Sequence, residues 1–302
     1  MKPAAFEYVA PTTVEEALSH LAEYGYDAKV LAGGQSLIPM MNFRLAQPSV
    51  LVDLNKLAEL SFIRAEDDGE LRIGAMTRHH QVEHNALVAE HAPLIHEAMP
   101  KIATPQIRSR GTFGGSIAHA DPAAELTTIC VALDGRFRCQ SARGERWVPA
   151  KEFFLGMFTS VLEPDEMLVE IAIPPMAPRT GWALEEEARR AHDFALVGVG
   201  AVVTLDAQNR CEHARLVFLS VGDGPVEAVK ATERLIGKEV TPDLIRAAAE
   251  AVTEELDPSA DIHASVEYRL HLARVLARRA LEKAFARAAA PGNPSSAREA
   301  LS

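Results

Sequence analysis

The chain has 302 residues, of which 48% are hydrophobic and 24% charged, as is ordinary for a soluble globular protein with room for two domains. A formal net charge of −11 at pH 7 argues against a nucleic-acid surface, and three widely spaced cysteines without a Cys-x-x-Cys pair exclude an evident zinc or iron–sulfur site within the chain. No signal-peptide core and no apolar run of roughly 20 residues is present, so we expect a cytoplasmic protein with no transmembrane segment.

The first predicted element is a helix over residues 12–25. Thr13 and Glu16 have the spacing of a capping box, apolar residues recur at helical spacing after them, and Gly25 is placed to end the helix. A short apolar strand then leads into a loop of small residues, Ala-Gly-Gly-Gln-Ser at 32–36. Such a loop has few side chains to pack into a core, but it lets the backbone pass close to a ligand.

Two further strands are predicted after this loop. Residues 37–45 are too short and too interrupted by proline to predict a helix. Residues 50–54 and 70–75 have the composition of buried strands. The order helix, strand, strand, strand describes a small mixed α/β subdomain.

The pattern from residue 77 to about 103 is helical, with Thr77 as a cap and Pro93 at the start of a second helix. His80 and His84 have a spacing that metal ligands use, but no acidic residue stands where the base of a His-Glu-x-x-His site belongs. We expect the histidines of this segment to lie on solvated helix faces and predict no metal site. They are His79, His80, His84, His91 and His96.

A second glycine-rich stretch spans residues 107–125, Ile-Arg-Ser-Arg-Gly-Thr-Phe-Gly-Gly-Ser-Ile-Ala-His-Ala-Asp-Pro-Ala-Ala-Glu. Asp121 and Pro122 predict the start of a helix. A glycine-rich turn that leads into a helix suits a phosphate or diphosphate, although a tight surface turn has the same composition. Neither this loop nor the first matches a dinucleotide fingerprint or a Walker loop. The two loops together could close on one diphosphate from two sides.

The next predicted elements are a helix over residues 122–133 and a hairpin turn at Asp134-Gly135. Three phenylalanines between residues 153 and 158 form an aromatic cluster expected in the core. Residues 168–173 alternate as a strand does.

The proline-rich residues 174–178 are the predicted domain boundary. Beyond it the chain is expected to form an antiparallel meander and then helices. The strands are predicted over 181–187, 194–205 and 214–221, and the helices over 226–236, 242–256 and 264–288. Residues 289–302, rich in Pro, Gly, Ser and Ala, are predicted to be disordered.

With these segments assembled, the chain resembles the FAD-binding medium subunits of the molybdenum hydroxylases. It is most similar to the medium subunit of aerobic carbon monoxide dehydrogenase and more distantly similar to the FAD-binding subunit of xanthine dehydrogenase. The likeness covers about residues 1–288. It rests on the motifs at 32–41 (Ala-Gly-Gly-Gln-Ser-Leu-Ile-Pro-Met-Met), 107–125, 189–199 (Arg-Arg-Ala-His-Asp-Phe-Ala-Leu-Val-Gly-Val) and 265–269 (Ser-Val-Glu-Tyr-Arg).

The resemblance implies an α+β fold with two domains. The first, residues 1–177, would be a vanillyl-alcohol-oxidase-like, PCMH-type FAD-binding domain with subdomains at about 1–58 and 59–177. The second, residues 178–288, would resemble the C-terminal domain of carbon monoxide dehydrogenase flavoproteins, built of antiparallel strands and helices. A disordered tail would follow at 289–302.

The resemblance also implies non-covalent FAD, with the two glycine-rich loops holding its diphosphate through backbone N–H groups and the hydroxyls of Ser36, Thr112 and Ser116. Glu125 would make a ribose or nearby polar contact, and Asp193 would approach the isoalloxazine. Ile102 would lie near the flavin or adenine, and Leu168 would give a backbone or apolar contact. The implied cofactor-binding residues are Leu31, Ala32, Gly33, Gly34, Gln35, Ser36, Leu37, Ile102, Gly111, Thr112, Phe113, Gly114, Gly115, Ser116, Glu125, Leu168 and Asp193.

The chain departs from the family pattern in three places. Gln35 stands where relatives often have His or another polar residue, and Phe113 stands where Ile or Val is common. A loop that contacts its ligand through the backbone tolerates both. Glu185 falls where some relatives carry a Lys against the flavin, so that role is not carried over.

The function implied is electron transfer. Electrons from a molybdopterin centre on a large subunit would pass through [2Fe-2S] clusters on a small subunit to FAD on this chain, and then to an external acceptor. The complex would be a dimer of heterotrimers, cytoplasmic or peripheral to the inner face of the membrane. No catalytic residue is expected on the chain, because the chemistry belongs to the flavin.

Two other functions are compatible with the sequence. A free-standing FAD oxidase or dehydrogenase would need its own base, for which His192 or Asp193 could serve. A non-catalytic scaffold subunit would use the glycine loops as turns only. The sequence leaves open the substrate (carbon monoxide, a purine, nicotinate or an aldehyde), the electron acceptor (a quinone, NAD or oxygen) and whether the isolated chain retains FAD.

Overall fold

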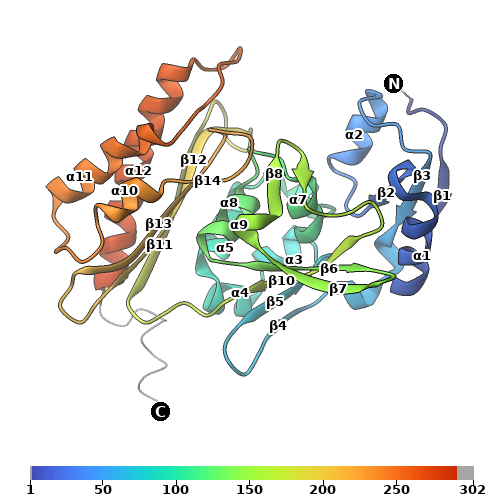
Figure 1. Ribbon diagram of the computed structural model, residues 1–302, viewed down its shortest axis with the longest axis horizontal. Coiled ribbons are helices and arrows are strands. Elements are labelled where there is room, and N and C mark those ends of the chain that lie inside the picture. The colour runs from blue at the N-terminus through green and yellow to red at the C-terminus, as the bar shows by residue number, and fades with distance from the viewer. Residues whose placement is uncertain (1, 291–302) are drawn as a thin grey trace.

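The computed structural model describes residues 2–290, which form three regions along the chain, each built on its own sheet (Figure 1). The N-terminal region is blue in Figure 1, the central region is cyan to green, and the C-terminal region is yellow to red. The mixture of helices with mostly antiparallel sheets confirms the predicted α+β class. Among these residues no helix is both long and apolar enough to cross a membrane.

The N-terminal region is a parallel sheet of order β1-β3-β2 with a helix packed on it. Its main helix, α1, begins as predicted: the Thr13 hydroxyl accepts a hydrogen bond from the Glu16 N–H, and Gly25 ends the helix with φ of 52°. A short helix, α2, lies where none was predicted, because Pro39 falls in the first turn, where the missing N–H has no helical partner to lose. The elements are β1 (Glu7–Val9), α1 (Val14–Tyr24), β2 (Ala28–Leu31), α2 (Leu37–Asn42) and β3 (Val50–Asp53).

The central region is a five-stranded antiparallel sheet of order β4-β5-β10-β6-β7, with seven short helices among the described residues. Its strands are β4 (Ile63–Ala65), β5 (Leu71–Gly74), β6 (Arg136–Ser141), β7 (Gly144–Pro149) and β10 (Met167–Ile173), with a small hairpin of β8 (Phe154–Gly156) and β9 (Thr159–Ser160). The helices are α3 (His79–Glu83), α4 (Ala86–His91), α5 (Pro93–Ala98), α6 (Pro105–Arg108), α7 (Phe113–His119), α8 (Glu125–Ala132) and α9 (Ala150–Phe153).

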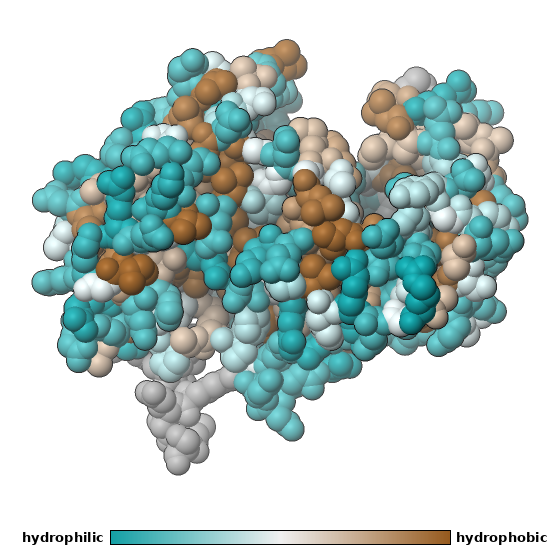
Figure 2. Space-filling model, viewed as in Figure 1, coloured by the Kyte–Doolittle hydropathy of each residue, from teal (hydrophilic) through white to brown (hydrophobic). Residues whose placement is uncertain are grey.

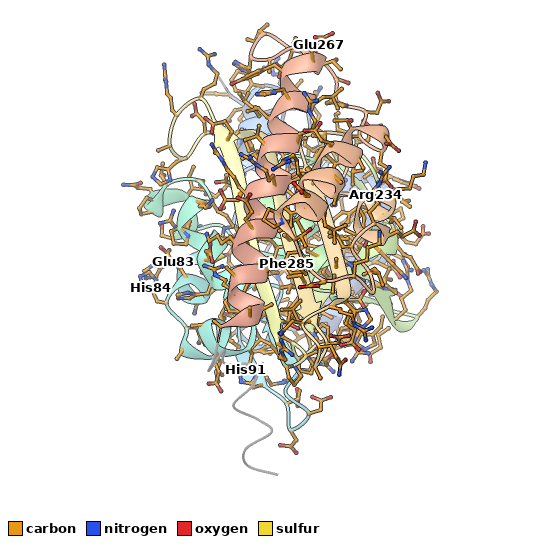
Figure 3. The ribbon with its side chains drawn as sticks, turned by 90° about the vertical axis from the view of Figure 1, so that its left-hand side faces the viewer. Glu83, His84, His91, Arg234, Glu267 and Phe285 are labelled. Carbon is orange, nitrogen blue, oxygen red and sulfur yellow. The ribbon has the colours of Figure 1, made fainter. Side chains whose placement is uncertain are left out.

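The C-terminal region is the predicted antiparallel meander followed by helices. Its sheet follows chain order, with β11 (Thr180–Ala188), β12 (Ala195–Leu205), β13 (Cys211–Leu219) and β14 (Val226–Glu227). The helices are α10 (Val229–Glu233), α11 (Pro242–Ala251) and α12 (Val266–Ala289). Figure 3 shows α12 running across the face of the sheet from Glu267 past Phe285. The helix predicted from residue 226 therefore starts later, because its first two residues pair with β13.

Helices cover both faces of the C-terminal sheet. Four β12 residues that alternate along the strand, Val197, Val199, Ala201 and Val203, are buried in one core with the inner face of α12. The opposite face of β12 meets α8 of the central region, and a Cβ placed on Gly200 would lie 3.6 Å from the Ala132 Cβ. The C-terminal sheet is therefore packed directly against the central region and is not connected to it by the linker alone.

Strand β10 is buried along its whole length. The register of its pairing with β6 shifts between Leu168 and Glu170. Met167 and Val169 pack into the core of the N-terminal region, whereas Leu168, Ile171 and Ile173 pack into the central core. The alternation expected over residues 168–173 is thus not an alternation of buried and exposed side chains, because both faces of the strand are covered.

Two predicted turns are corrected by the structure. The glycine pair Gly114-Gly115 is helical within α7, and the next helix begins at Glu125 rather than at Pro122. Asp121 instead accepts a hydrogen bond from the Ala123 N–H in a local turn.

Residues Asp134-Gly135 end α8 and do not form the predicted hairpin turn. The hairpin turn lies at Ala142-Arg143, since Ser141 pairs with Gly144. The short strands β1 and β4 were not predicted. Three residues are too few to show a period.

The remaining predictions on organisation concern the linker and the end of the chain. Residues 174–178 connect β10 to β11, and the division into domains at this point stays a prediction. Helix α12 extends through Ala289, so the predicted tail begins at least one residue too early. Residues 291–302 lie outside the described residues.

Candidate functional site: two glycine loops at one cavity

The two glycine-rich loops lie directly against each other. A Cβ placed on Gly33 would be 2.5 Å from the Arg110 carbonyl oxygen and 2.8 Å from the Gly111 Cα. A Cβ on Gly115 would lie 3.6 Å from the Ala32 Cβ. Segments almost 80 residues apart in sequence thus form one wall, and glycine at 33 is required for their approach.

A cavity of about 380 Å³ opens at this wall. Its lining includes the first loop from Leu31 to Gln35, the side chains of Asp53 and Asn55 that follow β3, and Arg110 of the second loop. Figure 2 shows a notch between the N-terminal region, at the right of the view, and the rest of the molecule. The sequence prediction therefore finds the first loop of the cavity but misses Asp53, Asn55 and Arg110.

The backbone donors of the two loops differ in availability. In the second loop, the N–H groups of Gly111, Phe113, Gly114 and Ser116 donate to the carbonyls of Ile107, Thr77, Ala75 and Thr112, and the Gly115 N–H donates to the Thr112 hydroxyl. No acceptor within the described chain takes the N–H groups of residues 33–36. A diphosphate would therefore find its backbone donors in the first loop, where Gly34 has φ of 73° and the Ser36 hydroxyl is exposed.

His79 holds the start of α7 in place. Its Nε2 lies 3.0 Å from the Thr112 carbonyl oxygen, which can only accept, so Nε2 carries the proton. Burial lowers the pKa of His79 to about 4, which keeps the ring neutral. The expectation that this histidine lies on a solvated face is wrong, and so is the predicted cap at Thr77, whose hydroxyl bonds to the backbone of Phe62.

Glu125 begins α8 inside a cluster of charged side chains. Burial, followed by the nearby carboxylates of Glu186 and Asp121, raises the pKa of Glu125 to about 7, although Lys101 opposes the shift. The Lys101 Nζ lies 3.9 Å from Glu186 Oε1 and donates to the Leu184 carbonyl. A carboxyl group that is partly protonated near neutral pH can donate a hydrogen bond to a ribose oxygen as well as accept one.

Glu125 gives a testable pH dependence. Its folded-state pKa is above its unfolded-state value, so the folded state binds more protons between about pH 4.5 and pH 7, and stability falls as pH rises through that window. We expect Glu125→Gln to stabilise the protein at pH 8 relative to the wild type, by roughly 1–3 kcal/mol, and to have less effect at pH 5. Thermal unfolding at both pH values measures this. An equal effect at the two pH values would contradict it.

The other predicted site residues are dispersed. Ile102 and Phe113 are buried in the central core, as is the Leu168 side chain within β10. Asp193 is exposed between β11 and β12. No hydrogen bond or ion pair within residues 2–290 joins Asp193 to the glycine loops, so its approach to a flavin stays a prediction.

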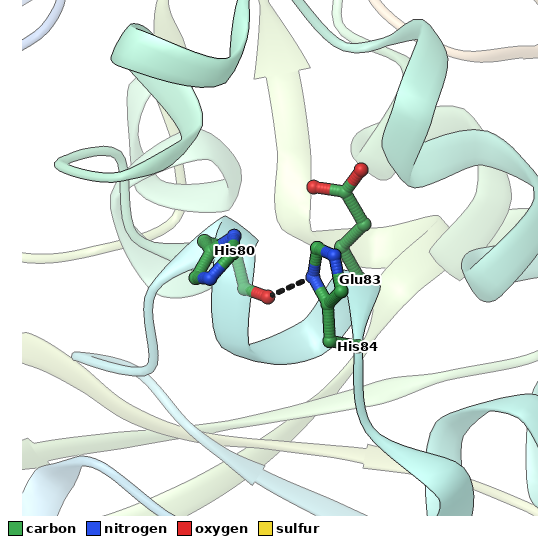
Figure 4. Close-up of side chains that lie close together, drawn as sticks. All are labelled: His80, Glu83 and His84. Carbon is green, nitrogen blue, oxygen red and sulfur yellow. Dashed lines mark hydrogen bonds between the residues drawn. The ribbon is translucent and has the colours of Figure 1, made fainter.

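The histidine pair with metal-like spacing acquires a third neighbour in the structure. His80, Glu83 and His84 offer ligand atoms within 4.8 Å of one another (Figure 4). However, both oxygens of Glu83 accept hydrogen bonds from the buried guanidinium of Arg108, at 2.8 and 3.1 Å. That ion pair already neutralises the carboxylate, and a dication would have to bind next to the guanidinium.

The aromatic cluster expected in the core is only partly buried. Phe153 packs edge-on against Phe137 and Phe154, with ring centroids 4.7 and 5.2 Å away. Phe158 is instead 50% exposed and lies against the ring of His119. With Leu155 and Met157 it forms an exposed apolar surface on the β8–β9 hairpin, where brown atoms gather near the middle of Figure 2.

Two protein families match the chain over most of its length. Residues 4–176 match the FAD binding domain in molybdopterin dehydrogenase, and residues 182–284 match the CO dehydrogenase flavoprotein C-terminal domain. The chain therefore belongs to the family of FAD-binding subunits of molybdopterin dehydrogenases.

Individual relatives are similar over almost the whole chain. It is 43% identical to the 6-hydroxypseudooxynicotine dehydrogenase complex subunit alpha of Paenarthrobacter nicotinovorans, over 95% of this chain and 97% of the relative. It is 40% identical to the carbon monoxide dehydrogenase medium chain of Hydrogenophaga pseudoflava, over 96% of this chain and 100% of the relative. A solved structure of carbon monoxide dehydrogenase from that organism superposes with a TM-score of 0.92 at 39% identity, over 95% of this chain and 99% of the other.

Proposed function

We propose that this chain is the FAD-binding electron-transfer subunit of a molybdenum hydroxylase complex. The observation that carries the proposal is the contact between the two glycine loops at one cavity, where the N–H groups of residues 33–36 have no acceptor within the described chain. FAD supplies the redox chemistry when bound. The described residues offer backbone donors and the Ser36 hydroxyl for a diphosphate, and Glu125 for a ribose.

Partner subunits would supply the rest of the reaction. The three cysteines are buried within the fold, so none is available to hold an iron–sulfur cluster at the surface. We place molybdopterin on a large subunit and [2Fe-2S] clusters on a small one, in a cytoplasmic dimer of heterotrimers. The apolar surface of Leu155, Met157 and Phe158 is consistent with a chain that works in contact with others.

The substrate would be selected elsewhere in the complex. The chain has 40–43% identity to relatives named for carbon monoxide, caffeine, nicotine and 6-hydroxypseudooxynicotine. Similar identity to subunits of such different enzymes supports selection of the substrate outside this subunit. We further propose that residues 1–177 form a PCMH-type FAD-binding domain and residues 178–288 a separate C-terminal domain.

The test is to purify the complex from its native source through a tag on this chain and to record its absorption spectrum, metal content and subunit sizes. We expect flavin bands over an iron–sulfur background, molybdenum, and two additional chains. Flavin without metal or partners would instead indicate a free-standing oxidase. A colourless single chain that does not take up added FAD would leave the loops as turns in a scaffold.

A further inference from the structure

The second glycine loop contributes a positive charge that has no partner among the described residues. Arg110 lines the cavity, and its exposed guanidinium forms no ion pair or hydrogen bond within residues 2–290. The backbone N–H groups around it are already bonded, as described above. The charge of Arg110 is therefore still available to a ligand.

A second guanidinium is bonded to the backbone of Arg110. Arg78, at the start of α3, donates hydrogen bonds to the Arg110 carbonyl and to the Asn55 side-chain oxygen. Burial lowers the pKa of Arg78, and so does the nearby charge of Arg110, while Asp53 opposes the shift. Asp53 itself accepts hydrogen bonds from the Tyr8 hydroxyl and the Asn55 N–H. Arg110 and Asp53 thus line the cavity, and Arg78 is bonded to the backbone of Arg110, on a chain whose net charge is −11.

Asn55 and Arg78 also link the two loops. The Asn55 Nδ2 donates to the Ala32 carbonyl of the first loop at 2.9 Å, and Arg78 joins the Asn55 oxygen to the Arg110 carbonyl of the second. These two side chains therefore set the position of the backbone that carries Arg110 relative to the free N–H groups of the first loop.

We propose that Arg110 binds the diphosphate of the dinucleotide, opposite the N–H groups of residues 33–36, and that Asn55 and Arg78 are positioning residues for it. A diphosphate carries two negative charges and suits a site with backbone donors on one side and a guanidinium on the other. This rests on the proposed function, and it assigns distinct roles to the two loops: the first supplies backbone donors and the second supplies charge.

The test uses the complex purified through a tag on this chain, freed of flavin and titrated with FAD by fluorescence quenching. Arg110→Gln should weaken FAD binding by about 10- to 100-fold, the range for loss of a charge-assisted hydrogen bond. Arg110→Lys should lose less, because it keeps the charge without the planar fork. Arg279→Gln removes the same charge from an exposed position on α12 and should leave FAD affinity unchanged.

Competition experiments test whether Arg110 acts on the diphosphate of the ligand. The inhibition constant of ADP, which has a diphosphate, should rise in Arg110→Gln relative to the wild type, whereas that of adenosine should be the same in both. FAD affinity should also depend less steeply on salt in Arg110→Gln. A double-mutant cycle tests the positioning role of Asn55. Asn55→Ala should weaken FAD binding when Arg110 is present, but it should add little to the loss of affinity already caused by Arg110→Gln, because both substitutions affect the same contact.

The outcomes separate the two proposals. A wild-type complex that binds FAD, with unchanged affinity in Arg110→Gln, would overturn the role of Arg110 and leave the proposed function standing. Equal weakening for ADP and adenosine would also overturn it, because the residue would then act through the fold of the site. A wild-type complex with no affinity for FAD would overturn the proposed function itself.

Discussion

Gly33→Ala should remove most of the flavin from the complex while leaving its molybdenum and iron in place. The added Cβ would lie 2.5 Å from the Arg110 carbonyl oxygen and 2.8 Å from the Gly111 Cα, and both are backbone atoms that cannot rotate away. The two loops would have to separate, so the donors of the first and the guanidinium of the second would no longer face one ligand. The flavin-to-molybdenum ratio of the purified complex measures the effect, and we expect it to fall roughly ten-fold or more.

The matched control is Gly200→Ala on β12, where an added Cβ would make only ordinary contacts, none closer than 3.6 Å. It should keep the wild-type ratio. A Gly33→Ala complex with full flavin content would show that the contact between the loops is not part of the site. Loss of flavin in both variants would point to a general loss of stability instead.

Gly181→Ala should strongly destabilise the C-terminal region. A Cβ on Gly181, in β11, would lie 1.9 Å from the Ala284 carbonyl oxygen and 2.6 Å from the Ala288 N of α12. The long helix would have to lift from the sheet and disturb the apolar core beneath it. We expect a loss of about 3 kcal/mol or more, and a melting temperature lower by roughly 6 °C or more.

Gly200→Ala on the neighbouring strand β12 is the control for this variant. Its Cβ would make ordinary contacts, 3.6 Å from the Ala132 Cβ and 3.8 Å from the Thr128 Cγ2. Its melting temperature should stay close to that of the wild type, measured by circular dichroism. If Gly181→Ala melted at the wild-type temperature, the close packing of α12 on β11 would be contradicted.

The features predicted correctly from sequence were those with local causes. The first helix has Thr13 at its N-cap and Gly25 at its end, which are the positions that their chemistry predicts. The meander of the C-terminal region follows from long apolar strands joined by turns. The glycine pair at 33–34 marks the first loop because glycine tolerates positive φ and close approach.

The errors arose where distant segments decide the structure. Gly114 and Gly115 resemble a turn in sequence, but Thr112 caps a helix over them, and the Gly114 N–H bonds to the Ala75 carbonyl. The sequence around His79 is typical of a surface histidine, but in the structure its side chain is buried. Arg110 and Asn55 carry no motif of their own. Their place at the cavity follows from how the strand ends and loops meet in space.

The burial of both faces of β10 has a consequence for folding during synthesis. Met167 and Val169 complete the core of the N-terminal region, although they are synthesised more than a hundred residues after that region's own strands. The first sixty residues therefore leave the ribosome before the strand that covers their core. Their apolar surface stays uncovered until β10 has been synthesised. Such long-range closure slows folding and favours aggregation during synthesis, so this chain should depend on chaperones when overproduced alone.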